Sequence, residues 1–431
     1  MWREVRLDGE RVTRLAQALK AAEAPVRILR GLEWPASARD SFLRQRGERL
    51  PDIQYASFDP GPTLSRLDGI RAELQPEGDP VDAWLGRIAD RVASGARLLA
   101  SRGTPEFLTH SRALFGAPRD PLPDEESTCL ELAQVFHRTI ASLSRLDLGA
   151  PPPACHLASW VAEQMRAALD ERLGADAPVV EVVDHLSANA LAGPRRIRLR
   201  RTASFTDRDF TQLLHHEAWV HVITGLNGRY QDRLPILAAS HPGTTRTQEG
   251  LAVFAEMISG SIDLDRVRRL ADRVVAVQMA VDGADFIEVH RFFVERGAGP
   301  EQAFENARRV FRGGVLTGGA PFTKDIVYLD GLLRVQTFLS HVVASGRSDC
   351  LRLLFAGKLD IEDVPALAIL TRAGLCRLPR HLPPWAEDLR YLIGYLAWSS
   401  FLGSVDMERV GAHYDVLLAA APRLDGTEDS A

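Results

Sequence analysis

Three histidines and a glutamate lie within seven residues of each other, in the stretch His-His-Glu-Ala-Trp-Val-His from His215 to His221. In zinc hydrolases with an H-E-x-x-H helix, the two histidines are four residues apart and share one helix face. Here His216 and His221 are five residues apart, which on a regular α-helix separates their directions by about 140°. A π-bulge widens the turn to i→i+5 and would bring both rings to one face. Two interpretations follow: a metal-binding pair on a π-bulged helix, or a regular helix with an unrelated buried histidine and a solvent-facing Glu217.

A third candidate ligand, Glu249, follows His221 by 28 residues in the segment Arg-Thr-Gln-Glu-Gly-Leu-Ala. Thr247 is a plausible N-cap, which puts Glu249 in the first turn of a second helix. In that position a glutamate can simply stabilise the helix dipole. However, Gly250 costs about 1 kcal/mol in a helix interior relative to alanine, which indicates that a neighbouring helix, a metal or a substrate approaches closely. We therefore favour one zinc ion held by two histidines and Glu249.

The elements that must position these residues are mostly helical. The chain has 431 residues, of which 25% are charged, and this composition is that of an ordinary globular protein with a large core. Apolar residues recur every three or four positions in most segments, as in Val81–Arg102. Two segments differ from this pattern and indicate a small sheet. β-Branched residues dominate Val179–Val183, and charged and apolar residues alternate in Arg195–Arg201. The predicted fold class is α+β, mostly helical.

Proline-rich segments divide the chain into three predicted regions. Breaks at Gly116–Ser127, Leu148–Ala154 and Leu378–Trp385 suggest boundaries. We predict a helical N-terminal region (residues 1–150), a catalytic core (151–345) and a helical C-terminal region (346–431). The Asn227–Gly228 pair predicts a tight turn that ends the histidine helix. The N-terminal region contains no recognisable motif.

Charge and cysteine usage exclude several classes of protein. The chain has 52 Lys and Arg against 57 Asp and Glu, so its net charge of −5 argues against a general nucleic-acid binder. The longest uncharged apolar run, Tyr391–Val405, is shorter than the roughly 20 residues of a membrane-spanning helix. The N-terminus has no apolar stretch typical of a secretory signal, and the four cysteines are dispersed. We expect a cytoplasmic protein with no membrane or nucleic-acid partner.

The ordered motifs resemble a known family. Four segments are similar to segments of the flavohemoglobin expression-modulating QEGLA-motif proteins of bacteria. They are His215–His221, Thr224–Gly228, the QEGLA segment Gln248–Ala252 and Gly318–Gly331. That family is related to tubulin-tyrosine carboxypeptidases with an HExxxH zinc motif. The resemblance runs from about Val179 to Leu333. The QEGLA segment is also similar to the NEGFA segment of gluzincin aminopeptidases.

This resemblance implies a gluzincin-like metallopeptidase core. It implies zinc (Zn²⁺) as the cofactor, with His216, His221 and Glu249 as ligands and Glu217 as the general base. The five-residue histidine spacing departs from ordinary gluzincins and agrees with the QEGLA family. The strand predicted at Gly193–Thr202 would be the sheet edge that pairs with an extended peptide, by analogy with that fold.

Several nearby residues have candidate supporting roles. Glu256 lies seven residues beyond Glu249 on roughly the same helix face, where it is either the carboxylate that accepts from a ligand histidine or a solvated glutamate. His215 is interpreted as a packing residue. His241, in the segment between the two helices, remains a spare ligand candidate.

A carboxypeptidase also needs a cation for the terminal carboxylate and a donor for the developing oxyanion. Lys324 is the predicted cation, with Arg246, Arg229 and the strand arginines as alternatives. Tyr328 is the predicted donor, and its alternative is a buried tyrosine that bonds to the backbone.

The predicted function is therefore that of a zinc metallopeptidase of carboxypeptidase type, which removes the C-terminal residue of a peptide or protein. Two alternatives stay open: a regulatory or binding protein that keeps a zinc site without turnover, and a zinc hydrolase of non-peptide amides. The substrate's terminal side chain and the oligomeric state do not follow from the sequence.

Overall fold

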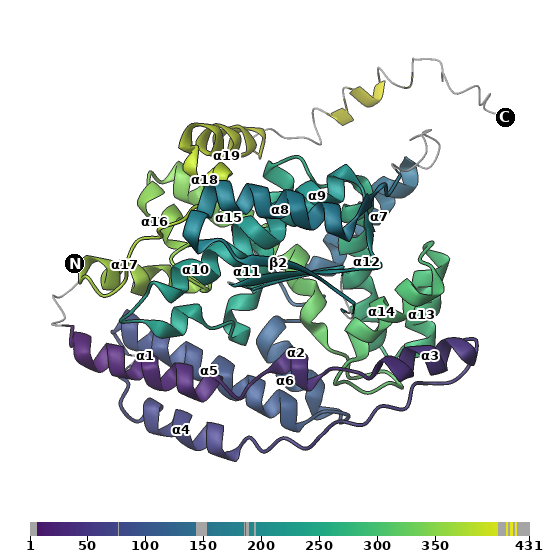
Figure 1. Ribbon diagram of the computed structural model, residues 1–431, viewed down its shortest axis with the longest axis horizontal. Helices are drawn as coiled ribbons and strands as arrows, with labels where there is room; N and C mark the ends of the chain where they lie inside the picture. Colours follow the sequence, from purple (N-terminus) through teal and green to yellow (C-terminus); the bar gives the residue numbers. More distant parts are fainter. Residues whose placement is uncertain are drawn as a thin grey trace.

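Helices surround two small sheets in this computed structural model (Figure 1). It describes residues 7–403 except 76, 144–152, 185, 187–188 and 194, and also residues 411–412, 414–416 and 419. The predicted mostly helical α+β class is confirmed at this level. Within the described ranges, no helix combines the length and hydropathy that a bilayer crossing requires.

The elements follow one another in three stretches of chain. The first stretch holds α1 (Gly9–Glu23), α2 (Ile28–Gly31), α3 (Ala36–Arg44), α4 (Gly61–Arg71), α5 (Pro80–Ala100), α6 (Glu106–Phe115) and α7 (Cys129–Ser142). The second holds β1 (His156–Leu157), α8 (Ala158–Leu173), η1 (Gly174–Asp176), β2 (Val179–Val183), β3 (Ala190–Gly193), β4 (Arg196–Arg200), β5 (Ser204–Phe205), α9 (Asp207–Leu213), η2 (Leu214–Val222), α10 (Ile223–Arg229), η3 (Pro235–Ala238), η4 (Pro242–Thr244) and α11 (Thr245–Ile258). The third holds α12 (Leu264–Val281), α13 (Phe286–Glu295), α14 (Pro300–Phe311), η5 (Thr323–Ile326), α15 (Val327–Ala344), α16 (Ser348–Leu353), η6 (Ile361–Asp363), α17 (Val364–Arg372), α18 (Pro384–Glu387) and α19 (Leu389–Gly403).

In the long helix α5, the apolar residues that recur at helical spacing are the ones that the fold buries. Trp84, Leu85, Ile88 and Val92 recur at helical spacing and are all buried. The side chain of Asp79 caps the first turn by accepting from the backbone N–H groups at the start of the helix. The helix predicted at residues 81–102 is confirmed, and in Figure 1 it lies with α1, α4 and α6 at the bottom of the view.

The three-stranded sheet has the order β2-β4-β3, in which β4 runs parallel to β2 and antiparallel to β3. The predicted alternation along β4 is confirmed, because Ile197 and Leu199 are fully buried and the intervening arginines are not. The prediction that this strand forms the sheet edge is wrong. β3 returns along β4 from Ala190 to Gly193 and uses the backbone groups that an edge would leave free.

Two hydrophobic cores meet at η2. The larger core includes residues from the N-terminal helices, α11, α15 and the last helices, so it draws on all three predicted regions. The smaller core lies between α8, the three-stranded sheet and η2. Val220 of η2 belongs to the larger core, whereas Ala218, Trp219 and Val222 belong to the smaller one. A helix that packs against two cores is held rigidly, which suits it to carry a site. The predicted boundary at residue 150 lies outside the described residues, and the division into three regions stays a prediction.

The predicted turn at Asn227–Gly228 is wrong, because α10 continues to Arg229. The buried side-chain amide of Asn227 donates to the carbonyl oxygens of Phe355 and His381, which ties the helix to the C-terminal region. A Cβ on Gly228 would overlap the carbonyl group of Leu237. These tertiary contacts explain an asparagine and a glycine that looked like turn residues.

Gly250 does mark a close approach between helices, as expected. α11 and α15 cross at this point, and a Cβ on Gly250 would overlap the backbone carbonyl of Gly331. We expect Gly250→Ala to lower the free energy of unfolding by about 1–3 kcal/mol or more, since the two backbones would have to separate. Thermal melting measures this effect.

The matched control is Gly69→Ala in α4, where the added Cβ would meet nothing within 4 Å. Alanine should leave stability unchanged or raise it by up to about 1 kcal/mol there. Equal melting temperatures for the two variants would show that the helices do not pack as closely as described.

Candidate metal centre

The histidine helix is a π-helix over its central part. Thr206 and Asp209 form a capping box that starts α9, and the chain then passes directly into η2, a π-helix of 9 residues. The predicted i→i+5 geometry is confirmed and extends further than a one-residue bulge. Widening the turn places His216 and His221 on one face although they are five residues apart.

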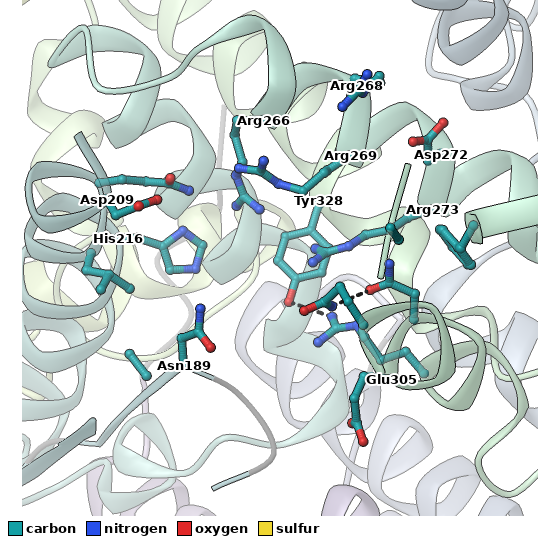
Figure 2. Close-up of a pocket in the computed structure, with 18 of the residues that line it drawn as sticks. Asn189, Asp209, His216, Arg266, Arg268, Arg269, Asp272, Arg273, Glu305 and Tyr328 are labelled. Atoms are coloured by element: carbon teal, nitrogen blue, oxygen red, sulfur yellow. Dashed lines mark hydrogen bonds between the residues drawn. The ribbon is translucent and has the colours of Figure 1, made fainter. Parts of the chain in front are cut away.

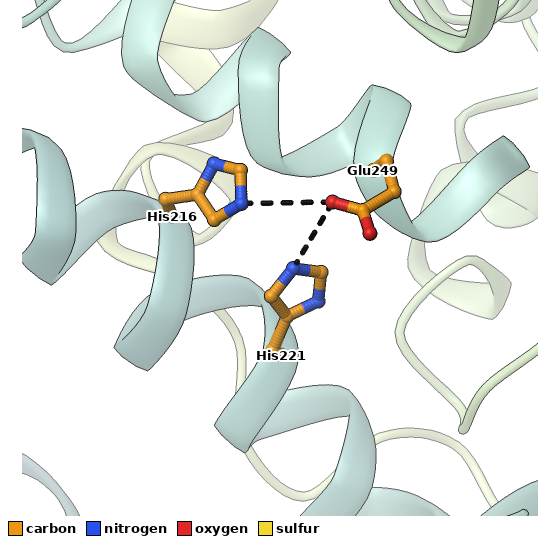
Figure 3. A group of neighbouring side chains, drawn as sticks. All are labelled: His216, His221 and Glu249. Atoms are coloured by element: carbon orange, nitrogen blue, oxygen red, sulfur yellow. Dashed lines mark ion pairs between the residues drawn. The ribbon is translucent and has the colours of Figure 1, made fainter. Parts of the chain in front are cut away.

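His216, His221 and Glu249 converge on one point (Figure 3). Oε2 of Glu249 is 3.7 Å from Nε2 of His216 and 3.7 Å from Nε2 of His221. One ligand atom from each residue lies within 4.8 Å of the others. The two rings are 5.0 Å apart between centroids and nearly perpendicular. The group is compatible with a bound metal ion, and it joins η2 to α11.

His215, interpreted as a packing residue, and His241, the spare ligand candidate, do not join this group among the described residues. The Nδ1 atoms of His215 and His241 are buried without a hydrogen-bond partner. Burial lowers the pKa of His215, and burial with the nearby Arg91 lowers the pKa of His241 to about 4. Both rings are therefore neutral packing side chains at physiological pH.

Glu256 lies behind His216, on the side away from Glu249. Its Oε1 atom is 2.6 Å from Nδ1 of His216, and Arg266 donates to both carboxylate oxygens at 2.8 Å. Gln212 adds a donor at 2.9 Å. Burial opposes ionisation of Glu256, but Arg266 and His216 outweigh it and lower its pKa to about 2. The carboxylate therefore stays charged and fixes the orientation of the His216 ring.

Lys324 contacts the other oxygen of Glu249. Its Nζ donates to Oε1 at 3.0 Å, and both side chains are largely buried. Burial opposes ionisation of Glu249, yet Lys324 and the two histidines hold its pKa well below the usual range. The lysine predicted to hold a substrate carboxylate thus has a carboxylate partner within the protein.

A cavity of about 580 Å³ opens beside His216, which is the member of the converging group that lines it (Figure 2). His216, Glu217 and Tyr328 are part of its wall. Burial and the charge of Glu249 oppose ionisation of the Tyr328 hydroxyl, but the surrounding cations outweigh them and lower its pKa. Among the described residues, nine arginines line the cavity: Arg200, Arg266, Arg268, Arg269, Arg273, Arg296, Arg308, Arg309 and Arg312.

Arg200 is one of the strand arginines named above as alternative cations, and the other eight are functional candidates that the sequence reasoning missed. They come from α12, α14 and the residues that follow α13 and α14, so no linear stretch reveals them. One signal was present: Arg266, Arg269 and Arg273 are three and then four residues apart, and therefore share one face of a helix. Lys358 was also missed; burial lowers its pKa, whereas Glu249 and Glu217 act in the opposite direction.

Arg246, the alternative cation, is used inside the fold. Its Nε is 2.7 Å from Oδ2 of Asp330, and its NH2 donates to the carbonyl of Phe115 at 3.0 Å. It is not among the described residues that line the cavity. A role for Arg246 in substrate binding stays a prediction.

Two histidines on one helix and a carboxylate on the next define a candidate metal centre of the two-histidine, one-carboxylate class. The chain belongs to the microtubule-associated tyrosine carboxypeptidase family, whose model matches residues 40–404. The relation to tubulin carboxypeptidases expected from the motifs is thereby confirmed.

No curated protein matches the chain. Among solved structures, a putative lipoprotein from Colwellia psychrerythraea is similar, with 13% sequence identity over 90% of this chain and 75% of that one. Its TM-score of 0.38 is too low to carry any argument about fold or function.

Proposed function

We propose that this protein is a zinc-dependent carboxypeptidase that removes the C-terminal residue of a peptide or protein. The observation that carries the proposal is the convergence of His216, His221 and Glu249, together with the position of His216 and its neighbour Glu217 on the wall of a cavity. Membership of a family described as carboxypeptidases supports the reaction type. The finer relationships, to the QEGLA-motif proteins and to a gluzincin-like core, are part of the proposal and rest on the motifs in the sequence.

The donor set and its spacing fit zinc. Two imidazoles and one carboxylate are a frequent ligand set of catalytic zinc, with bond lengths near 2.1 Å. Tetrahedral ligands at that distance lie about 3.4 Å apart. The 3.7 Å separations between Glu249 and each histidine need only a small contraction. When bound, zinc would lower the pKa of a water molecule and polarise the scissile carbonyl.

Glu217 is the proposed general base. It directly follows His216 in η2 and is part of the cavity wall, where a water molecule and a substrate have access. A carboxylate there can take a proton from the attacking water and pass it to the leaving amine. Tyr328 is the proposed donor to the oxyanion, and its lowered pKa makes its hydroxyl a stronger hydrogen-bond donor.

Glu256 and Lys324 are proposed to position the ligands rather than to touch the substrate. Glu256 holds the Nδ1 side of His216, so that Nε2 faces the other ligands. Lys324 occupies one oxygen of Glu249 and leaves the other oxygen directed at both histidines. Such partners orient metal ligands and raise metal affinity.

A peptide library analysed by mass spectrometry tests the reaction. We expect the zinc-loaded protein to remove single residues from the C-terminus, and a chelator to abolish this until zinc is restored. Peptides with an amidated C-terminus serve as the control, because a carboxypeptidase requires the free carboxylate. Losses from the N-terminus, or turnover that survives complete metal removal, would contradict the proposal. Metal binding without any turnover would favour a binding protein that keeps a zinc site.

A further inference from the structure

The helix α19 is anchored on one side and exposed on the other. Leu392 and Leu396 are fully buried, and the hydroxyl of Tyr391 donates to the carbonyl of Ile258 at 2.8 Å. In Figure 1 the helix lies at the upper edge of the molecule, and it packs on α15 and α18. Arg390 is the single charged residue in its sequence. The fold therefore holds α19 firmly and presents an almost uncharged outer face.

Four large side chains are exposed on this outer face. Tyr391, Ile393, Trp398 and Phe401 are 49%, 37%, 60% and 57% exposed. The rings of Trp398 and Phe401 are 5.5 Å apart between centroids, so they form one continuous aromatic surface. A contiguous exposed apolar surface marks a site of contact with another molecule more often than scattered apolar residues do.

Gly394 lies in the middle of this surface, and the chain itself gives no reason for a glycine there. It is exposed, and an added Cβ would meet nothing within 4 Å. Glycine destabilises an exposed helix interior relative to alanine. At Gly250 the same cost has a cause, because the backbone of Gly331 approaches closely. By the same reasoning, Gly394 indicates the close approach of a helix that no described part of this chain supplies.

The spacing of the exposed residues is self-complementary. Tyr391, Gly394, Trp398 and Phe401 are three, four and three residues apart, so they form one stripe along the helix. This spacing reads the same in both directions. An antiparallel second copy centred beside Leu396 would therefore present the same stripe in reverse. Trp398 of each copy would lie over Gly394 of the other, as a knob in a hole. Phe401 would likewise lie against Tyr391.

The charge pattern favours a second copy over other occupants. A two-fold contact repeats every residue across the axis, so charges near its centre would repel each other. Arg390 lies at one end of α19, and antiparallel pairing keeps the two arginines about 18 Å apart. A helix that binds a lipid surface carries Lys or Arg beside its apolar face, and α19 has neither between Tyr391 and Phe401. A different protein is selected largely by complementary charge, which this face does not offer.

The size of the face predicts a weak dimer. A large side chain has roughly 200 Å² of accessible surface, so the exposed fractions of these four amount to about 400 Å² in each copy. Two copies would bury about 800 Å² there, and the smaller residues between them bring the total towards the roughly 1,200 Å² of the smallest stable interfaces. We therefore expect a dissociation constant in the micromolar range.

We propose that two copies of this protein associate through α19, with the helices antiparallel and Trp398 of each copy over Gly394 of the other. The inference goes beyond the proposed carboxypeptidase function and does not depend on it. Sedimentation equilibrium of the full chain at concentrations from about 1 to 100 µM tests the association, and the expected result is a reversible monomer–dimer equilibrium.

Two substitutions test the arrangement. Gly394→Leu should weaken the dimer at least about tenfold, because the new side chain fills the space that Trp398 occupies. Within the monomer that position is open, so the melting temperature should stay the same or rise. Trp398→Glu should also weaken the dimer at least about tenfold, because it removes the ring and places two like charges near the axis. The matched control is Gly69→Leu, at an exposed position of α4 where a Cβ likewise meets nothing, and it should leave the dimer unchanged.

Two sedimentation results contradict the inference. A wild-type protein that stays monomeric at about 100 µM overturns it, and so does a dimer that both folded variants leave intact. Flotation with vesicles of phosphatidylcholine and phosphatidylserine tests the lipid alternative: a monomer that binds vesicles through Trp398 overturns the dimer as well. Melting curves establish that each variant is folded, and both changes are at exposed positions outside the core.

Discussion

Replacing Glu217 with glutamine is expected to lower kcat about 10²- to 10⁴-fold while leaving the metal and the fold in place. Glutamine has nearly the shape of glutamate but cannot take a proton from water. Glu217 is not one of the three converging residues, and it lies on the cavity wall rather than in a core. The kcat measured with a susceptible peptide should therefore fall, while the zinc content and the melting temperature stay close to those of the wild type.

The matched control is Glu171→Gln, because Glu171 is exposed on α8 and does not line the cavity. That variant should keep full activity. If Glu217→Gln kept more than about a tenth of the wild-type kcat, a general base elsewhere would have to be sought. An unchanged cellular effect of the Glu217→Gln protein would instead favour the binding-protein alternative.

The second large effect is expected for His216→Ala, which should weaken zinc binding by at least about a hundredfold. His216 supplies a ligand atom and connects the site to Glu256. Glu256 keeps its bonds to Arg266 and Gln212 in the variant, so no carboxylate is left buried without a partner. The fold should therefore persist while the metal is lost, and metal content after dialysis measures the difference.

His215→Ala is the matched control, because the neighbouring ring is not part of the converging group and its Nδ1 has no hydrogen-bond partner among the described residues. Zinc should remain at one equivalent per chain in that variant. Zinc retained at unit stoichiometry in His216→Ala would show that the ligand set is wrong, and chelator titration of both variants would make the comparison quantitative.

The residues that form the candidate centre could be found in the sequence because their pattern was local. A five-residue histidine spacing is incompatible with a shared metal on a regular α-helix, so it predicted the π-helix that the structure contains. Glycine at position 250 predicted a close helix contact, which Gly331 provides. The spacing of Glu256 from Glu249 predicted its side of the helix, and its 2.6 Å contact with His216 follows from that.

The sequence was a poor guide where long-range contacts decide the outcome. β4 has the alternation of a strand with one solvated face, yet β3 covers the edge that we expected to be open. Asn227 and Gly228 have the residue types of a turn, but contacts with distant backbone groups hold them in a helix. Periodicity reports which face of an element is buried and not which element covers it.

The charges around the site show the same division. The sequence by itself determined the chemistry of the candidate ligand set, its spacing and the mostly helical class, because each depends on side-chain type and helical or strand periodicity. Only the tertiary structure paired Lys324 with Glu249 and Arg309 with Asp325. The pairing of a charge depends on which residues the fold brings within a few ångströms, and residues from α12, α14 and η5 that are far apart in sequence meet here only because their helices pack together.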